Sequence, residues 1–418
     1  MIRANKPGIR ALECLNFFMA DVQAGIGPFL GVFLQARNWH TGAIGAVMTL
    51  GGIVGMLATA PAGALVDATH RKRALVVISS ILTVTASAVL LLSPKMWVVA
   101  SSQIATALAG AALGPALAGI TLGMVRKAGF DRQFGRNQAI NHAGNVVGAA
   151  LSGLLGWKFG FIAVFGLAAL FAVFALVSVL LIPATAIDNC AARGWENRET
   201  HEHHVSGLRV LLTCKPLLIL GFALLLFHLG NAAMLPLYGM AVVAAHQGNP
   251  ALFTALTIVV AQTVMVMMSM FAIRWMRKHG HWFVILLAFI ALPIRGIIAA
   301  YLIKSWGVWP VQALDGVGAG LQSVAVPAMV AALLQGTGRV NVGQGAVMTM
   351  QGVGAALSPL LGGIVADAFG FRMTFLLLGA ISVGSLALWC GYARQLRQRG
   401  DTDATPGPPI VPPRTAAT

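Results

Sequence analysis

The stretch VGAALSGLLG at residues 147–156 returns as VGAALSPLLG at residues 353–362, which is 206 positions later. Just beyond each copy, the tripeptide FGF at 159–161 recurs at 369–371, at an offset of 210. A third, looser match precedes both, at an offset of 208. These offsets are about half of the 418 residues of the chain. Three matches in the same order predict two homologous halves.

The composition predicts that these halves lie in a membrane. Hydrophobic residues make up 58% of the chain, charged residues 10%, and the mean hydropathy is +0.82. Soluble domains carry roughly a quarter charged residues, so this chain could not cover a soluble surface. A helix needs about 20 mostly apolar residues to cross a bilayer. Twelve stretches qualify: 11–36, 41–66, 74–93, 97–125, 137–157, 160–183, 216–245, 251–275, 282–303, 307–334, 341–367 and 372–393.

The predicted fold class is therefore an all-α integral membrane protein with twelve transmembrane helices in two pseudo-symmetric six-helix halves. We expect an N-terminal half at 1–183 and a C-terminal half at 215–393. Between them, residues 184–214 are polar enough to be a solvated central linker. The proline-rich segment at 394–418 is expected to be a disordered tail.

The distribution of basic residues predicts the orientation of the spans. With the N-terminus in the cytoplasm, 22 of the 28 Lys and Arg residues fall in cytoplasmic segments. Cytoplasmic loops of membrane proteins carry such an excess, so both termini are expected in the cytoplasm. The net charge of +16 is then a topology signal, and no nucleic-acid partner is expected. The expected location is a bacterial inner membrane.

The loop after the second predicted span reads GALVDATHRKR at residues 63–73. It resembles the signature loop of the major facilitator superfamily, Gly-x-Leu-x-Asp-(Arg/Lys)-x-Gly-(Arg/Lys)-(Arg/Lys). Five positions match that pattern: Gly63, Leu65, Asp67, Arg71 and Lys72. Ala68 and His70 depart from it, since they replace a basic residue and a glycine. The resemblance implies that the loop is a conformational latch with Asp67 as its anchor. Arg71 and Lys72 also serve as topology anchors in either case.

The resemblance covers essentially the whole chain and implies a secondary transporter working by alternating access. In this family a solute site lies between the halves, near the middle of the membrane. The resemblance does not extend to the antiporter signatures. Ala149 stands where the fifth-span signature has proline, and Thr106 where the fourth-span signature has arginine.

Three charged residues lie inside predicted spans, where each costs about 2.5–3.5 kcal/mol even on lenient scales. They are Asp21 in the first span, Arg295 in the ninth and Asp315 in the tenth. The family resemblance implies that the first and tenth helices line the central cavity. A carboxylate there could take up and release a proton as solvent access alternates. The alternatives are a structural hydrogen bond for Asp21 and an ion pair between Arg295 and Asp315.

Uncharged polar residues in the spans are weaker candidates for a coupling or solute site. His228 and Asn231 are three residues apart in the seventh span, so they share a helix face. Asn145 in the fifth span and Gln103 in the fourth are further possible lining residues. A histidine can carry a proton near neutral pH, although a packing role for His228 is an equal alternative.

The sequence gives less support to a metal-binding site or to an enzymatic activity. Methionines in the eighth span, such as Met267 and Met270, suit Cu(I), but methionine usually fills space in helices. The sequence His201-Glu202-His203-His204 is best explained as a solvated loop. No phosphate-binding loop, metal-hydrolase motif or nucleophile elbow is present, so neither an enzyme nor a cofactor is expected.

The function expected from the sequence is secondary active transport of a small organic solute, coupled to protons, with efflux slightly favoured over uptake. The protein is expected to be a monomer in the lipid bilayer. The alternatives are an uptake permease, including a copper importer, and a non-transporting sensor or assembly protein on the same scaffold.

Overall fold

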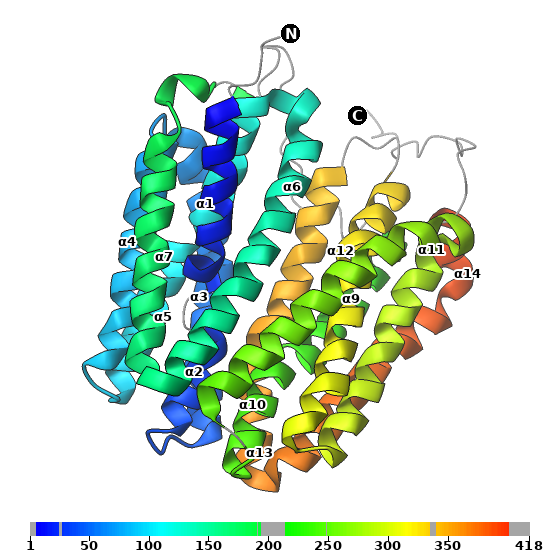
Figure 1. Ribbon diagram of the computed structural model, residues 1–418. Coiled ribbons are helices and arrows are strands. Elements are labelled where there is room, and N and C mark those ends of the chain that lie inside the picture. The colour runs from blue at the N-terminus through cyan, green and yellow to red at the C-terminus, as the bar shows by residue number, and fades with distance from the viewer. Residues whose placement is uncertain are drawn as a thin grey trace, which may run out of the picture.

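The computed structural model describes residues 6–24, 27–189, 191–193, 214–247, 249–334 and 340–400. Within these ranges the chain is almost entirely helical and has no strand (Figure 1). The N-terminal half contains α1 (Lys6–Ala24), α2 (Gly27–Gln35), α3 (Thr41–Ala68), α4 (Lys72–Ala88), α5 (Met96–Gly110), α6 (Leu113–Phe159) and α7 (Phe161–Leu181). The C-terminal half contains α9 (Lys215–Asn231), α10 (Met234–Ala244), α11 (Pro250–Tyr301), α12 (Val308–Leu333), α13 (Val340–Gly391) and α14 (Ala393–Gly400). Short 3-10 helices are η1 (Val89–Leu91), η2 (Ala184–Ala186), η3 (Ala191–Arg193) and η4 (Ser305–Gly307).

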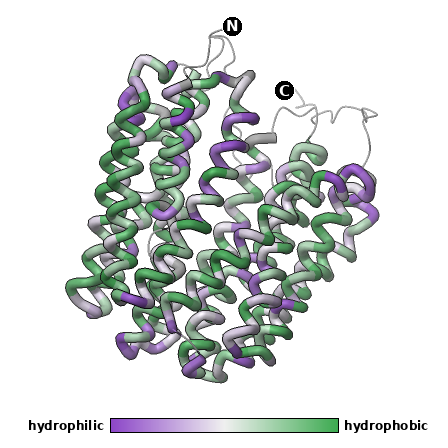
Figure 2. The backbone as a smooth tube through the Cα atoms, viewed as in Figure 1, coloured by the Kyte–Doolittle hydropathy of each residue, from purple (hydrophilic) through white to green (hydrophobic). Residues whose placement is uncertain are grey.

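Eight helical segments of the described chain are long and apolar enough to cross a membrane. Hydrophobic residues cover the outer faces of the bundle, whereas hydrophilic residues gather toward its two ends and along α6 (Figure 2). A helical bundle with this surface matches the hydrocarbon interior of a bilayer, in which every backbone group must be satisfied within the protein. The prediction of an all-α integral membrane protein is confirmed.

The two longest helices each contain a reversal. α11 and α13 have 52 residues each. At about 1.5 Å per residue, a straight helix of that length would be far longer than the roughly 30 Å of a hydrocarbon core. Gly280 in α11 and Gly370 in α13 interrupt them, with φ of 83° and 77°. Glycine adopts this left-handed conformation at little cost, so we interpret each helix as two spans joined at a glycine.

Backbone geometry supports the internal repeat found in the sequence. Gly160 has φ of 78° and ψ of −179°, where the chain turns from α6 into α7. Gly370, its counterpart in the second copy, has φ of 77° and ψ of 166°. The two FGF tripeptides therefore make the same turn in the two halves.

Several predicted boundaries differ from the structure. Two-residue turns interrupt the helices of the fourth and seventh predicted spans, between α5 and α6 and between α9 and α10, although Met96–Arg126 and Lys215–Ala244 are each apolar and long enough to cross a membrane as one segment. In the first predicted span, residues 25 and 26 lie outside the described residues. The charged stretch 127–136, predicted as a connector, is the helical start of the fifth span within α6. Charged residues can extend a helix beyond the apolar core of the membrane, so charge alone marked this boundary wrongly. The predicted tail begins with α14, and residues 194–213 of the predicted linker lie outside the described residues.

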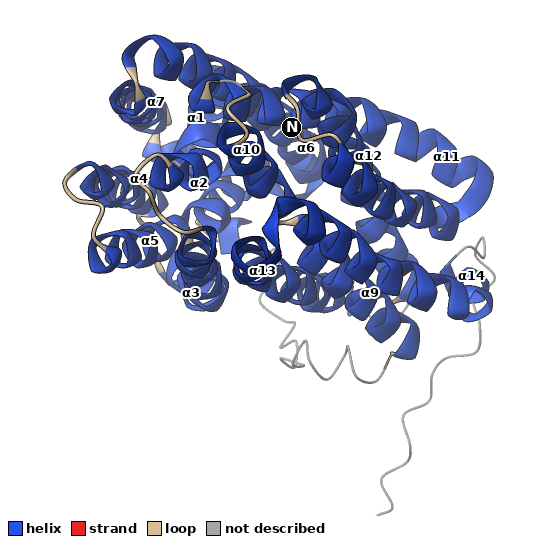
Figure 3. Ribbon diagram, turned by 90° about the horizontal axis from the view of Figure 1, so that it is seen from below, coloured by secondary structure: helices blue, strands red, loops and turns tan. Residues whose placement is uncertain are grey.

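The two halves meet along α3 and α13 and along α6 and α11 (Figures 1 and 3). We call the end of the bundle at which α1 begins the terminal end, and the opposite end the far end. Glycines allow close approach between the halves: a Cβ on Gly52 would lie 3.2 Å from the Cα of Ala356, and one on Gly45 would meet the carbonyl of Pro359. Small residues at such crossings let helix backbones pack directly.

Candidate functional site

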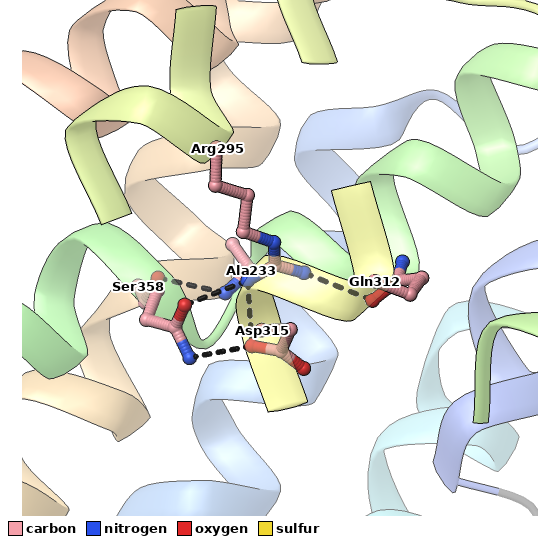
Figure 4. Close-up of polar contacts among 6 residues, drawn as sticks. Ala233, Arg295, Gln312, Asp315 and Ser358 are labelled. Carbon is pink, nitrogen blue, oxygen red and sulfur yellow. Dashed lines mark hydrogen bonds and ion pairs between the residues drawn. The ribbon is translucent and has the colours of Figure 1, made fainter. Parts of the chain in front are cut away.

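A polar cluster occupies the interior of the C-terminal half (Figure 4). Arg295 of α11 is completely buried. Its Nη1 donates hydrogen bonds to Asp315 Oδ1 at 2.7 Å and to Asn231 Oδ1 at 2.6 Å, and its Nη2 donates to Gln312 Oε1 at 3.2 Å. Asn231 Nδ2 donates in turn to Asp315 Oδ1 at 3.2 Å. The ion pair considered from the sequence is therefore present.

Three helices place these side chains. Arg295 comes from α11, while Gln312 and Asp315 lie three apart on one face of α12. Asn231 is the last residue of α9, just before the break that leads into α10. A helix break leaves backbone groups unpaired. Here Ser358 of α13 accepts a hydrogen bond of 2.9 Å from the Ala233 N–H, next to the cluster (Figure 4).

The cluster retains unused hydrogen-bonding groups. Arg295 Nε and Gln312 Nε2 are buried and have no acceptor among the described residues. The Asp315 side chain is 14% exposed, and its Oδ2 makes no hydrogen bond within the described chain. His228 stacks edge-on against Phe227, and its Nδ1 lies 2.9 Å from the Leu224 carbonyl. One carboxylate oxygen and two nitrogen donors thus remain available at this site.

Asp21 is placed in a different environment. It is half-buried on α1, and no described residue makes a hydrogen bond or an ion pair with it. It lines a cavity of about 60 Å³ whose other walls come from α2, α4, α6 and α7, all in the N-terminal half. Thr83 Oγ1 is buried there without a hydrogen-bond partner in the described chain. A Cβ on Gly148 would lie 2.9 Å from Asp21 Oδ1, so glycine at that position leaves room for the carboxylate.

The remaining predicted lining residues are not gathered around either charged group. Asn145 donates a hydrogen bond of 3.3 Å to Asn141, which donates one of 3.1 Å to the Asn16 carbonyl of α1. Gln103 packs on α3, where its Oε1 lies 3.3 Å from a Cβ built on Gly51. Both therefore lie in contacts within the N-terminal half.

The predicted latch forms the connection between α3 and α4. Lys72 is buried, and its Nζ donates to the Val66 carbonyl at 2.9 Å and to the Thr69 carbonyl at 3.0 Å. A cation at a helix C-terminus is favourable both for the unpaired carbonyls and for the helix dipole. Arg71 is exposed. A Cβ built on Gly63 would have no neighbouring atom within 4 Å, so no close packing requires glycine at this position. The side chain of Asp67 lies outside the part of the chain that the structure describes.

A contact between the halves at the far end was not identified from the sequence. Asp367 of α13 accepts hydrogen bonds from the first two N–H groups of α3, from Thr41 at 2.9 Å and from Gly42 at 2.7 Å. A carboxylate at a helix N-terminus is favoured by the helix dipole. We call this contact the far-end clasp. The sequence does show an acidic residue, Asp367, at the end of a predicted span. Its hydrogen-bond partners at the start of α3 lie more than 300 residues earlier in the chain, so the contact could not be inferred.

Three further hydrogen bonds join the halves within the described chain: Gln35 Nε2 of α2 donates to the Met240 carbonyl of α10 at 3.2 Å, and two more lie deeper in the bundle. Thr49 Oγ1 accepts from the Leu360 N–H at 3.0 Å, and His142 Nδ1 lies 3.0 Å from Gln262 Oε1. Among the described residues, the hydrogen bonds and glycine contacts between the halves lie between the far end and the middle of the bundle.

The methionines of α11 do not form a common site. Met267 and Met270 are exposed on the outer surface, whereas Met265 and Met268 pack against glycines of α12. The histidines at 201–204 lie outside the described residues. Within the described chain, no group of three or more His, Cys, Asp or Glu side chains could hold a metal ion.

These features define a polytopic membrane protein with a polar centre and a tight contact between two helical halves. A family model described as Major Facilitator Superfamily matches residues 12–310 and 294–415. Uncharacterized MFS-type transporter MT2531 of Mycobacterium tuberculosis (strain CDC 1551 / Oshkosh) is 38% identical over 386 residues, covering 91% of each chain. Uncharacterized MFS-type transporter Rv2456c of strain ATCC 25618 / H37Rv matches to the same extent. The chain belongs to the Major Facilitator Superfamily and is a membrane transporter of that type.

Solved structures of other transporters share this fold. The nucleoside transporter NupG has a TM-score of 0.74 at 13% identity, covering 93% of this chain and 98% of NupG. A bacterial homolog of the human lysosomal transporter Spinster, in an inward-facing and unoccupied conformation, has a TM-score of 0.68 at 14% identity, covering 97% and 100%. At these identities the likeness shows the fold alone.

Proposed function

We propose that the protein is a proton-coupled secondary transporter that moves a small organic solute by alternating access, with efflux slightly favoured over uptake. The observation that carries this proposal is the presence of two chemically distinct carboxylates within the spans. Asp315 is tied to Arg295, whereas Asp21 has no protein partner in the described chain. The unpaired carboxylate is suited to binding and releasing a proton, whereas the ion-paired carboxylate is suited to contacting the solute.

Asp21 is the proposed proton carrier. An ionised carboxylate near the bilayer centre costs about 2.5–3.5 kcal/mol even on lenient scales, and taking up a proton removes that charge. Since no described side chain offers a compensating hydrogen bond, a proton is the partner that this carboxylate can gain and lose. Three hydroxyl side chains line the adjoining cavity beside Asp21, namely Thr83, Ser87 and Ser152, and the Thr83 hydroxyl has no hydrogen-bond partner in the described chain.

The Arg295 cluster is the proposed solute contact in the C-terminal half. Its hydrogen bonds hold Asp315 and Asn231 at the break between α9 and α10, in the interior of the half. Breaks in transmembrane helices expose backbone groups and are typical of transporter binding sites. The free Oδ2 of Asp315 would accept a hydrogen bond from a solute donor. Asp315 remains a second candidate for proton coupling.

Alternating access is supported by the uneven distribution of contacts between the halves. The far-end clasp and the glycine crossings of α3 hold the halves together at the far end. If the terminal end faces the cytoplasm, as the basic residues predict, this conformation is inward-facing. Transport would then require the far-end clasp to open while contacts form at the terminal end. In this proposed orientation, the latch between α3 and α4 would lie at the cytoplasmic surface of the bacterial inner membrane.

Reconstitution into proteoliposomes tests the proposal. A panel of small organic solutes is offered with and without an imposed pH gradient, and internal pH is recorded with a trapped indicator. We expect at least one solute to move against its gradient and to change the internal pH as it does so. Solute movement that is unaffected by the pH gradient would show that the protein transports the solute without coupling to protons. Absence of any flux across the panel would favour a sensor or assembly protein.

A further inference from the structure

A second, larger cavity lies at the terminal end of the N-terminal half, away from the proposed transport site. Its volume is about 430 Å³. It lies between the start of α4, the end of α7 and the first residues after α7. Its lining residues are His70, Arg71, Lys72, Arg73, Ala74, Val77, Ile78, Leu180, Ala184, Ile187 and Asn189.

One rim of this cavity is basic. Residues 70–73 contribute the three basic side chains Arg71, Lys72 and Arg73, and no acidic residue is among the described residues that line the cavity. Two of these cations already bind helix ends. Lys72 binds carbonyls of α3, and Arg73 donates to the Val179 carbonyl at 3.1 Å and to the Leu180 carbonyl at 2.8 Å. Arg71 is exposed and has no acceptor in the described chain, so its guanidinium is available for an anion.

The other walls are apolar and continue onto the outer surface of the bundle. Val77 and Ile187 line the interior of the cavity. Ile78 is 54% exposed and Leu180 is 62% exposed, on helices whose outer faces carry further exposed apolar side chains. A ligand that fills this space must therefore be amphipathic, with an anionic part at Arg71 and an apolar part along Ile78 and Leu180.

The wall formed by the residues after α7 is fixed in place. The Asp188 N–H donates to the Gly123 carbonyl at 3.0 Å, and the Asp188 carboxylate pairs with Arg126 at 2.9 Å. A Cβ on Gly123 would lie 2.9 Å from Ile187 Cγ2, so this contact depends on glycine. Beside it, Asn189 Oδ1 is buried without a donor in the described chain and could accept a hydrogen bond from a ligand hydroxyl.

We propose that this cavity binds an anionic phospholipid from the leaflet at the terminal end. The headgroup phosphate lies on Arg71, and an acyl chain runs along Ile78 and Leu180. Basic pockets between transmembrane helices bind anionic headgroups in this way, and each basic residue near a membrane surface contributes about 1 kcal/mol to attraction of such lipids. The inference does not depend on the solute, the coupling ion or the direction of transport.

Lipid retention by the purified full-length protein tests this inference. The protein in a mild non-ionic detergent is mixed with phosphatidylglycerol, with phosphatidylcholine of the same acyl chains, or with soluble glycerol 3-phosphate. Bound species are counted by native mass spectrometry without any transport solute. We expect phosphatidylglycerol to be retained in preference to phosphatidylcholine, with glycerol 3-phosphate unable to displace it.

Variants locate the site. Arg71→Ala is expected to weaken phosphatidylglycerol binding about fivefold, since one headgroup charge contact is lost. Arg132→Ala removes an exposed arginine of α6 and should leave retention unchanged. Ile78→Trp fills the cavity without altering charge and should also reduce retention. Equal retention of the two lipids, equal effects of Arg71→Ala and Arg132→Ala, or displacement by glycerol 3-phosphate would overturn the proposal.

Discussion

The far-end clasp offers a direct test of how the two halves are held together. Asp367→Asn keeps the shape of the side chain but removes its charge, and its amide nitrogen cannot accept from the second N–H group. Hydrogen bonds to a charged group contribute about 1.5–3 kcal/mol each, and solvent exposure reduces this value. Because Asp367 is exposed, we expect a loss of about 1–2 kcal/mol from the far-end-closed state.

That loss changes the balance of conformations by a factor of about 5 to 30, since 1.4 kcal/mol corresponds to a factor of ten. Spin-label distance measurements can detect such a change. With the four native cysteines replaced by serine, one label pair at Lys95 and Lys304 reports on the far end. A second pair at Arg132 and Lys278 reports on the terminal end. In Asp367→Asn, the far-end distances should lengthen and the terminal-end distances should shorten.

Asp188→Asn is the matched control, because it neutralises an ion-paired carboxylate whose partner Arg126 lies in the same half. This variant should leave both distance distributions as in the unmodified protein. Unchanged distances in Asp367→Asn, or equal changes in the two variants, would refute the view that the clasp holds the halves together at the far end.

Three further substitutions probe other parts of the structure. Arg295→Met leaves Asp315 without its cation and should destabilise the fold by about 3–5 kcal/mol, measured as a lower thermal unfolding temperature. The double variant Arg295→Met/Asp315→Leu should recover most of that stability, because no unpaired charge remains buried. Failure of the double variant to recover would contradict the ion-pair account. Gly45→Ala places a Cβ against the Pro359 carbonyl, so the far-end label pair should separate; an unchanged distance would show that the crossing tolerates the methyl group. Lys72→Met removes two hydrogen bonds from the end of α3 and should cost about 1–3 kcal/mol in thermal unfolding, and no loss would exclude a capping role.

Features that depend on local sequence could be predicted well. The apolar composition indicated a membrane protein, and the repeated FGF tripeptide predicted two homologous halves, in which both copies turn at a left-handed glycine, Gly160 and Gly370. Arg295 and Asp315 were identified because charges are rare in spans, and their pairing brings together consecutive spans. In these cases the signal and its physical cause lie within a few residues or in neighbouring helices.

Features that depend on how helices distant in the sequence pack together could not be predicted. The partner of Asp367 is the start of α3, and nothing near either segment indicates the other. The break between α9 and α10 does have a sequence signal, since Pro236 lies four residues after Ala232 and a proline ring clashes with the carbonyl four residues before it. The stabilisation of this break by Ser358 of α13 is not visible in the sequence. The unpaired state of Asp21 is likewise a property of five packed helices, so sequence alone left open whether it was hydrogen-bonded.

Asp21 is the residue proposed to couple proton movement to solute movement, and gradient-driven flux in proteoliposomes is the sharpest test of that role. For any solute that the unmodified protein moves, Asp21→Asn is compared in two modes: exchange at equal pH and accumulation driven by a pH gradient. We predict that the variant exchanges solute but no longer accumulates it, because binding and alternation remain while the proton carrier is lost. Accumulation by Asp21→Asn equal to that of the unmodified protein would contradict the account.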